Sequence, residues 1–170
     1  MRRALDALYD AAAWAAALAL VGVLAMVLAS VAGRLLGFNQ RGSDAYAGYC
    51  MAAAAFLALA HTLKRGEHIR VTLLVQALAG RARKAIEVWA LAAAALLAAL
   101  FSFFSVRLAW QSYTFNDIST ANDATPLWIP QLAMAAGTLV LLVAFVDELV
   151  LELRGERVAA SGGEEALHNE

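Results

Sequence analysis

The sequence has little of what a soluble enzyme or a disulfide-stabilised domain requires. It contains one cysteine, three histidines and two prolines, and only 16% of its 170 residues are charged. The lone Cys50 excludes an internal disulfide, and a structural zinc site would lack ligands. The sequence also contains no recognisable pair of nucleophile and base, no glycine-rich phosphate loop and no metal-binding cluster. We therefore predict a chain that is not an enzyme and that binds no cofactor and no metal.

Charge is missing altogether from four long apolar stretches. These stretches lie at about residues 11–33, 45–63, 88–106 and 127–146. Helices of these lengths are roughly 28–35 Å long, which matches a hydrocarbon core of about 30 Å. Irregular backbone within lipid would leave amide groups unpaired, so each stretch must be helical. The sequence therefore predicts an all-α integral membrane protein with four transmembrane helices.

The four spans nearly fill the chain, so no separate soluble domain fits. We predict one membrane domain at residues 1–153 and a polar, disordered cytoplasmic tail at residues 154–170. Although the chain starts with Met1 and two arginines, its first apolar stretch is longer than the 7–15 residues or so of a signal peptide. We therefore expect the first helix to remain as a membrane anchor.

Basic residues are distributed unevenly between the connections. Only three of the 13 lysines and arginines, Arg34, Arg41 and Arg107, follow the first and third spans. Because cytoplasmic segments of inner-membrane proteins are enriched in basic residues, both termini and the middle connection are predicted to be cytoplasmic. All four tryptophans and all four tyrosines lie near span ends, where aromatic rings favour the membrane interface.

The connection between the second and third spans is predicted to contain a short interfacial helix. Gly66 is suited to ending the second helix. Residues 67–79 then place most of their apolar side chains on one helical face, but they are too few and too polar to span. We expect this segment to lie along the cytoplasmic surface, with its basic residues toward lipid phosphates.

The last span begins with a proline-containing stretch. Thr125 and Pro126 are predicted to be the N-cap and first residue of that helix. Pro130 falls near the first turn, so only a mild kink is expected.

Small residues suggest close packing between helices. Gly33 and Gly37 form a GxxxG pattern at the outer end of the first helix, and Ala133 and Gly137 have the same spacing in the last. Small side chains let membrane helices approach closely, although the sequence is also rich in alanine overall.

Two motifs resemble those of the small membrane subunit of tripartite ATP-independent periplasmic (TRAP) transporters, the DctQ-like family. The first is the basic turn and amphipathic segment at residues 64–74, and the second is the proline-tryptophan-proline segment at residues 125–130. The positions that define these motifs are Gly66, Glu67, His68 and Arg70 in the first and Pro126, Trp128 and Pro130 in the second.

The resemblance implies a scaffold subunit of a sodium-coupled secondary transporter that imports an organic acid, such as a C4-dicarboxylate. The implied partners are a large permease subunit, which holds the substrate and sodium sites, and a periplasmic solute-binding protein; no nucleic acid is expected. The connection at residues 110–125 is long for such a small protein, and long loops are often functional. Within it, Asp117 and Asp123 are candidate contacts for the binding protein, although Asp123 could equally cap a helix.

Two other classes of function remain open on the sequence. One is a membrane anchor subunit of a redox enzyme, with His61 and His68 as haem ligands. The other is a stand-alone small exporter, which would need an acidic residue within the membrane for proton coupling.

Overall fold

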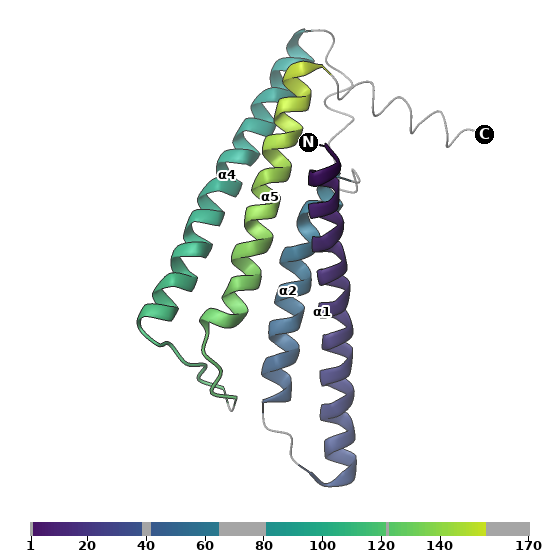
Figure 1. Ribbon diagram of the computed structural model, residues 1–170, viewed down its shortest axis with the longest axis vertical. Helices are drawn as coiled ribbons and strands as arrows, with labels where there is room; N and C mark the ends of the chain where they lie inside the picture. Colours follow the sequence, from purple (N-terminus) through teal and green to yellow (C-terminus); the bar gives the residue numbers. More distant parts are fainter. Residues whose placement is uncertain (1, 39–41, 65–80, 122, 156–170) are drawn as a thin grey trace, which may run out of the picture.

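The computed structural model describes residues 2–38, 42–64, 81–121 and 123–155. Four helices account for most of them: α1 (Arg2–Leu36), α2 (Ser43–Lys64), α4 (Arg81–Thr114) and α5 (Trp128–Arg154) (Figure 1). Each is long and apolar enough to cross a membrane, so the predicted all-α fold with four transmembrane helices is confirmed. The predicted interfacial helix at 67–79 lies outside the described residues, as does the tail beyond Gly155.

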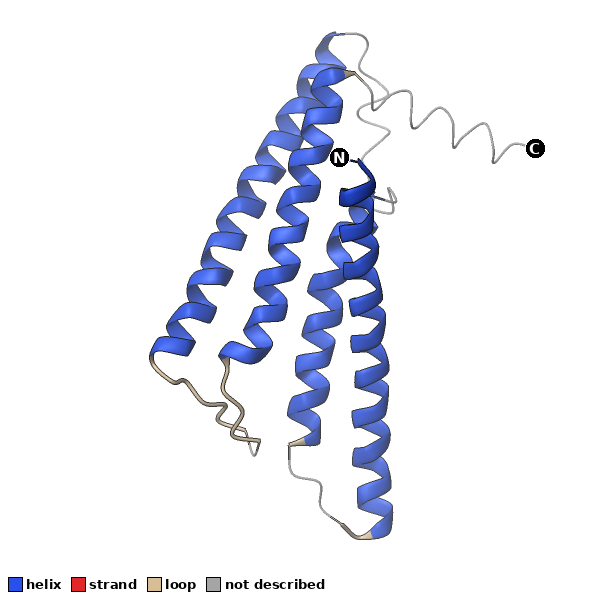
Figure 2. Cartoon of the chain, viewed as in Figure 1, coloured by secondary structure: helices blue, strands red, loops and turns tan. Residues whose placement is uncertain are grey.

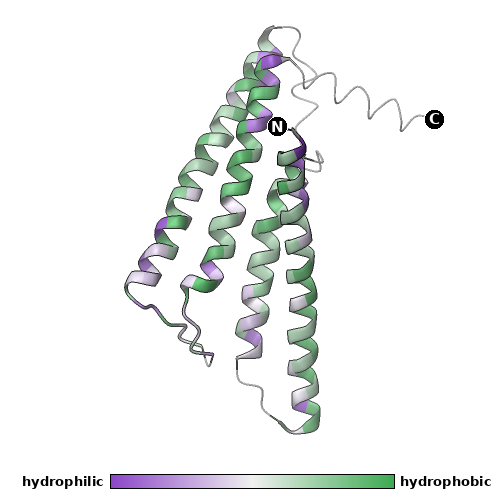
Figure 3. Ribbon diagram, viewed as in Figure 1, coloured by the Kyte–Doolittle hydropathy of each residue, from purple (hydrophilic) through white to green (hydrophobic). Residues whose placement is uncertain are grey.

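The apolar stretches predict the position of each helix but not its full length. α1 has 35 residues and α4 has 34, which correspond to helices about 50 Å long. That length exceeds the hydrocarbon core by about 20 Å, so both helices extend past the lipid or tilt within it. Hydrophobic residues predominate in the middle of the helices, and hydrophilic residues collect toward their ends (Figure 3).

Two antiparallel hairpins build the molecule. α1 packs along α2, and α4 packs along α5; α2 and α5 join the two pairs, so the order of neighbours is α1, α2, α5, α4 (Figure 1). The loops lie at the ends of the helices (Figure 2). Since α2 and α5 are the second helices of the two hairpins, they run in the same direction and finish at the same end of the bundle (Figure 1). Their ends therefore bring together residues that are distant in sequence.

Small side chains line the contact between α4 and α5. The buried residues of α4 along this stretch recur at spacings of three and four and are Ala98, Ser102, Ser105, Ala109 and Ser112. Because α5 is the helix along which α4 packs, this face is the α5-facing one. The hydroxyls of Ser102 and Ser105 have no hydrogen-bond partner among the described residues, so these serines act in packing.

α5 lies close against α2 at Gly137. A Cβ at this position would lie 2.5 Å from the carbonyl oxygen of Phe56 and 2.6 Å from its carbonyl carbon. The two backbones are thus in direct contact, as expected for a small residue at a membrane helix crossing. The Phe56 ring reaches past this crossing to Phe101 of α4, with 5.9 Å between ring centroids.

The GxxxG pattern of α1 has a different role from the one its sequence suggested. Gly37 has a φ of +76°, and the Phe38 amide donates a hydrogen bond of 3.0 Å to the Gly33 carbonyl. This left-handed residue and the bond back into the last turn are the signature of a Schellman C-terminus. Gly33 and Gly37 therefore end α1 in the described structure.

The predicted start of α5 is wrong by two residues. α5 begins at Trp128, and its N-cap is Leu127, which has no side-chain capping bond. Pro126 instead forms an isolated antiparallel bridge with Ile118, and Thr125 accepts a backbone bond of 2.8 Å from Ser119. This pairing holds the segment extended until Leu127. Pro130 then occupies the third helical position, where no intrahelical N–H is needed.

Candidate functional sites at the two ends of the helices

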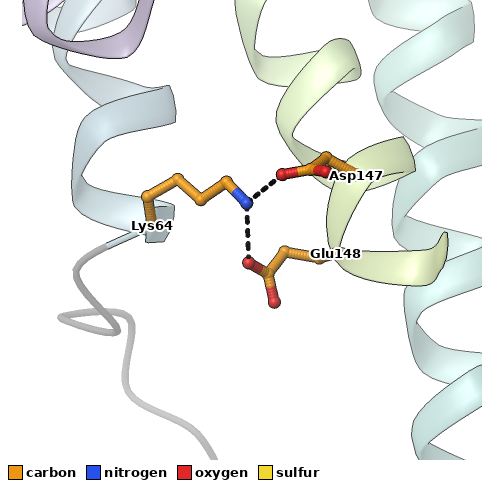
Figure 4. A network of polar contacts seen from close by, with 3 residues as sticks. All are labelled: Lys64, Asp147 and Glu148. Atoms are coloured by element: carbon orange, nitrogen blue, oxygen red, sulfur yellow. Dashed lines mark hydrogen bonds and ion pairs between the residues drawn. The ribbon is translucent and has the colours of Figure 1, made fainter. Parts of the chain in front are cut away.

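At the end of the bundle where α2 and α5 finish, one lysine joins the two helices. Lys64, the last residue of α2, forms ion pairs with Asp147 and with Glu148, whose Oε1 lies 3.1 Å from the lysine Nζ (Figure 4). All three side chains are largely buried, with exposed fractions of 20%, 21% and 10%. They meet because α2 and α5 are parallel and each carries charged residues directly after its apolar run.

The same cluster includes a residue from α1. The Tyr9 ring is 3% exposed and lies 5.4 Å from the Lys64 Nζ, within range of a cation–π interaction. Its hydroxyl has no hydrogen-bond partner among the described residues. Beside it, Ala60, Leu63 and Ala144 complete a small buried apolar cluster. Three helices therefore converge at this end of the protein.

The sequence places Tyr9 near the start of the first span and Asp147 and Glu148 just after the last span, but it does not connect them to Lys64. The available signal was a lysine ending one span and two acids ending another on the same side of the membrane. Connecting them requires knowing that α2 and α5 are neighbours, which hydropathy alone does not reveal.

At the opposite end, the connection between α4 and α5 folds onto α2. The Tyr49 hydroxyl donates a hydrogen bond of 3.0 Å to Asp123, and the Ser119 hydroxyl donates one of 2.8 Å to the other carboxylate oxygen. Thr125 also bonds to the Tyr46 hydroxyl, at 3.2 Å. These contacts fix the loop against the beginning of α2.

Hydroxyl groups also keep the Asp123 side chain of this loop charged. Thr125, Ser119 and Tyr49 stabilise the charged carboxylate and lower the pKa of Asp123 to about 2. The depressed pKa keeps Asp123 charged at any pH well above 2, and only strong acid would protonate it. Gly42, at a φ of +83°, lies directly against this residue: a Cβ there would be 2.7 Å from the Asp123 Cβ. The loop is therefore an ordered part of the fold.

The two candidate docking residues differ in their surroundings. The Asp123 carboxylate accepts hydrogen bonds from Tyr49 and Ser119, as described above. Asp117 has an exposed side chain, while its backbone is held by a 2.9 Å bond from Leu127 and a 3.0 Å bond to Ser112. The structure therefore presents Asp117 at the surface on a fixed backbone and uses Asp123 to hold the loop.

The remaining predicted motif residues fall partly within the described structure. The Trp128 ring packs edge-on against the Tyr113 ring, with centroids 5.6 Å apart. This contact joins the start of α5 to the end of α4. Pro126 and Pro130 flank it as described. Gly66, Glu67, His68 and Arg70 lie outside the described residues.

Within the described parts of the chain, no three His, Cys, Asp or Glu side chains converge as metal ligands. His61, one of the two candidate haem ligands, is instead directed toward Asp10, with 3.9 Å between Nδ1 and Oδ1. Its side chain is 22% exposed at the end of the membrane span.

Comparison with known proteins identifies the family. The family model "Tripartite ATP-independent periplasmic transporters, DctQ component" matches residues 23–155, from within α1 to the end of α5. No curated protein matches the chain. The match covers well over half of the sequence and agrees with the resemblance in the two motifs. The chain therefore belongs to the DctQ component family of the tripartite ATP-independent periplasmic transporters.

Proposed function

We propose that this chain is the non-catalytic scaffold subunit of a sodium-coupled transporter for an organic acid such as a C4-dicarboxylate. Its partners would be a large permease subunit and a periplasmic solute-binding protein. The main supporting observation is that the middle of every span lacks an ionisable residue. Coupling sites within membranes normally use such residues, so the sodium and substrate sites belong to another subunit.

The distribution of basic residues supports an orientation in the bacterial inner membrane. Lysine and arginine are concentrated at both termini and in the connection between α2 and α4, which would be cytoplasmic. The loop between α4 and α5 would then face the periplasm, where a binding protein could reach it.

Contacts at three levels support a subunit that keeps its shape during transport. Lys64 joins α2 to α5 at the cytoplasmic end, Gly137 contacts Phe56 in the middle, and Tyr49 bonds to Asp123 at the other end. A helix that shifted relative to its neighbours during each transport cycle would have to break these contacts. Membership of a transporter family also leaves little support for the redox-anchor alternative.

A disulfide between α1 and α2 tests the scaffold role. A Cβ at Gly22 would lie 3.7 Å from the Cβ of Cys50, within the range of about 3.5–4.5 Å found in disulfides. We expect Gly22→Cys to form a cross-link on oxidation. Uptake into proteoliposomes that contain all three components should remain sodium-dependent and unchanged, because neither helix has to move relative to the other.

The matched control carries Gly22→Cys together with Cys50→Ala and cannot form the bond. If oxidation stops uptake in the first variant, spares the control and is reversed by reductant, α1 and α2 move and the scaffold role is wrong. Uptake that persists without this chain, or without a sodium gradient, would contradict the wider proposal.

Charge reversal at Asp117 tests the docking surface. Its side chain is exposed beside Phe115, which is 73% exposed, on a loop fixed by Asp123. Because charges at the rim of an interface act mainly on association, Asp117→Lys should slow uptake about threefold at low salt. The difference should shrink as ionic strength rises.

Uptake kinetics against binding-protein concentration would measure this effect, with Asp117→Asn expected to give an intermediate result. Equal rates for Asp117→Lys and the parent at low salt would exclude a contribution of this residue to docking. Asp123 is unsuitable for the same test, because its replacement would also release the loop from Tyr49 and Ser119.

A further inference from the structure

A groove lies between α1 and α2 close to their cytoplasmic ends. It has a volume of about 310 Å³ and is lined by Asp10, Ala13, Trp14 and Ala17 of α1 and by His61 of α2. The four α1 residues are spaced at three or four positions, so they form one stripe along the helix. Seven residues of helix correspond to about 10 Å. The groove is therefore elongated along the direction of the membrane span.

The polarity of the groove changes along its length. Asp10 is the last charged residue before the apolar run of α1, and His61 lies in the last turn of α2. Ala13 and Ala17 follow one and two turns deeper, within the apolar run. Trp14, which is 73% exposed, flanks the transition. A polar end at headgroup level and an apolar floor toward the hydrocarbon match the polarity of a phospholipid.

The groups at the polar end favour a particular headgroup. The Asp10 carboxylate is 67% exposed and available to a cation, and the face of the Trp14 indole also attracts cations. The His61 Nδ1 lies 3.9 Å from the Asp10 carboxylate, and the other ring nitrogen, Nε2, can carry the N–H that donates to a phosphate oxygen. A headgroup carrying only negative charge would be repelled by Asp10, whereas an ammonium group next to a phosphate would complement all three side chains.

We propose that this groove binds an aminophospholipid of the phosphatidylethanolamine type. Its ammonium group lies between Asp10 and Trp14, its phosphate faces His61, and one acyl chain runs along Ala13 and Ala17. The bound lipid fills the groove between α1 and α2 at the level of Asp10 and His61. This site does not depend on the transport function proposed above.

The site can be tested with the full-length chain in nanodiscs that contain equal amounts of phosphatidylethanolamine and phosphatidylglycerol. Native mass spectrometry after release from the nanodisc measures which lipid remains bound. The parent chain should retain phosphatidylethanolamine in preference to phosphatidylglycerol. Asp10→Asn and Trp14→Leu should each lower this retention about two- to fivefold, as expected for one interfacial ion pair or one cation–π contact. Ala17→Phe should reduce it by filling the apolar floor.

Two matched controls separate the groove from general effects at the membrane boundary. Asp6→Asn removes an exposed acid one turn earlier on α1, and Trp89→Leu removes a tryptophan of α4 that is also 73% exposed. Both should retain the lipid as the parent does. Thermal melting identifies any variant that is misfolded. If Ala17→Phe disrupts the packing of α1 against α2, lipid retention by Asp10→Asn decides the test, because that substitution is exposed and nearly isosteric.

Three results would overturn the proposal. Equal retention of phosphatidylglycerol by the parent would exclude the ammonium-specific headgroup site. Equal losses in the groove variants and in the two controls would mean that the groove is not where the lipid binds. Absence of retained lipid from the parent would mean that the groove is empty or is a contact surface for another protein chain.

Discussion

Replacing Gly137 with alanine should destabilise the protein by about 1–3 kcal/mol, the usual cost of overpacking a tight contact. The added methyl group would meet the carbonyl oxygen and carbon of Phe56 at 2.5 and 2.6 Å, so α2 and α5 would have to separate. The Phe56 carbonyl belongs to the helix backbone, so it cannot avoid the added methyl group by changing rotamer as a side chain could. Chemical denaturation in mild detergent should report the loss, and co-purification with the large subunit should report its consequence for assembly.

Gly48 of α2 provides the control, because a Cβ at that position would meet no atom within 4 Å. Gly48→Ala should be neutral or stabilising by up to about 1 kcal/mol, since alanine is the better helix former. Shortening the Phe56 side chain should not rescue Gly137→Ala, because the two nearest atoms belong to the backbone. Full stability of Gly137→Ala would show that the two helices are not in backbone contact.

Removing Lys64 from its cluster with Asp147 and Glu148 should have an effect of similar size. Lys64→Met leaves Asp147 and Glu148 together in a largely buried site without their shared cation. Breaking a fully buried pair typically costs 3–5 kcal/mol; because these side chains keep some exposure to solvent, we expect a loss of about 2–3 kcal/mol. Thermal unfolding in detergent would measure it.

Two further variants distinguish lost charge from lost packing. Lys64→Arg keeps the positive charge and should retain most of the stability, although the guanidinium must adapt to a site occupied by an ammonium group. Combining Lys64→Met with Asp147→Asn and Glu148→Gln removes the uncompensated charge and should recover part of the loss. If Lys64→Met is as stable as the parent, the cluster does not hold α2 to α5.

The four membrane spans could be predicted from sequence because lipid imposes a simple rule. An uncharged run of about 20 residues must form a helix in the hydrocarbon core, so the four spans were identified correctly. Their ends were less predictable, because α1 starts as early as Arg2 and α4 continues to Thr114. Helices can continue into water, where hydropathy no longer distinguishes a helical segment from a loop.

Long-range partners explain most of what the sequence could not reveal. Thr125 and Pro126 have the chemistry of a helix start, but backbone pairing with residues near Ile118 takes precedence over capping. Asp123 likewise finds its partner Tyr49 at a separation of 74 residues. The spacing of Ala133 and Gly137 predicted a close approach, yet it could not indicate that the neighbour would be Phe56 of α2.

The parallel arrangement of α2 and α5 has a consequence for the order in which the protein is made. Lys64 reaches the membrane early in synthesis, but its partner Asp147 is 83 residues further along the chain. Until α5 is inserted, the first hairpin carries a cation at its end with neither of these carboxylates beside it. Neutralising that cation favours docking of the second hairpin, so the Lys64 cluster can form only after α5 has been inserted.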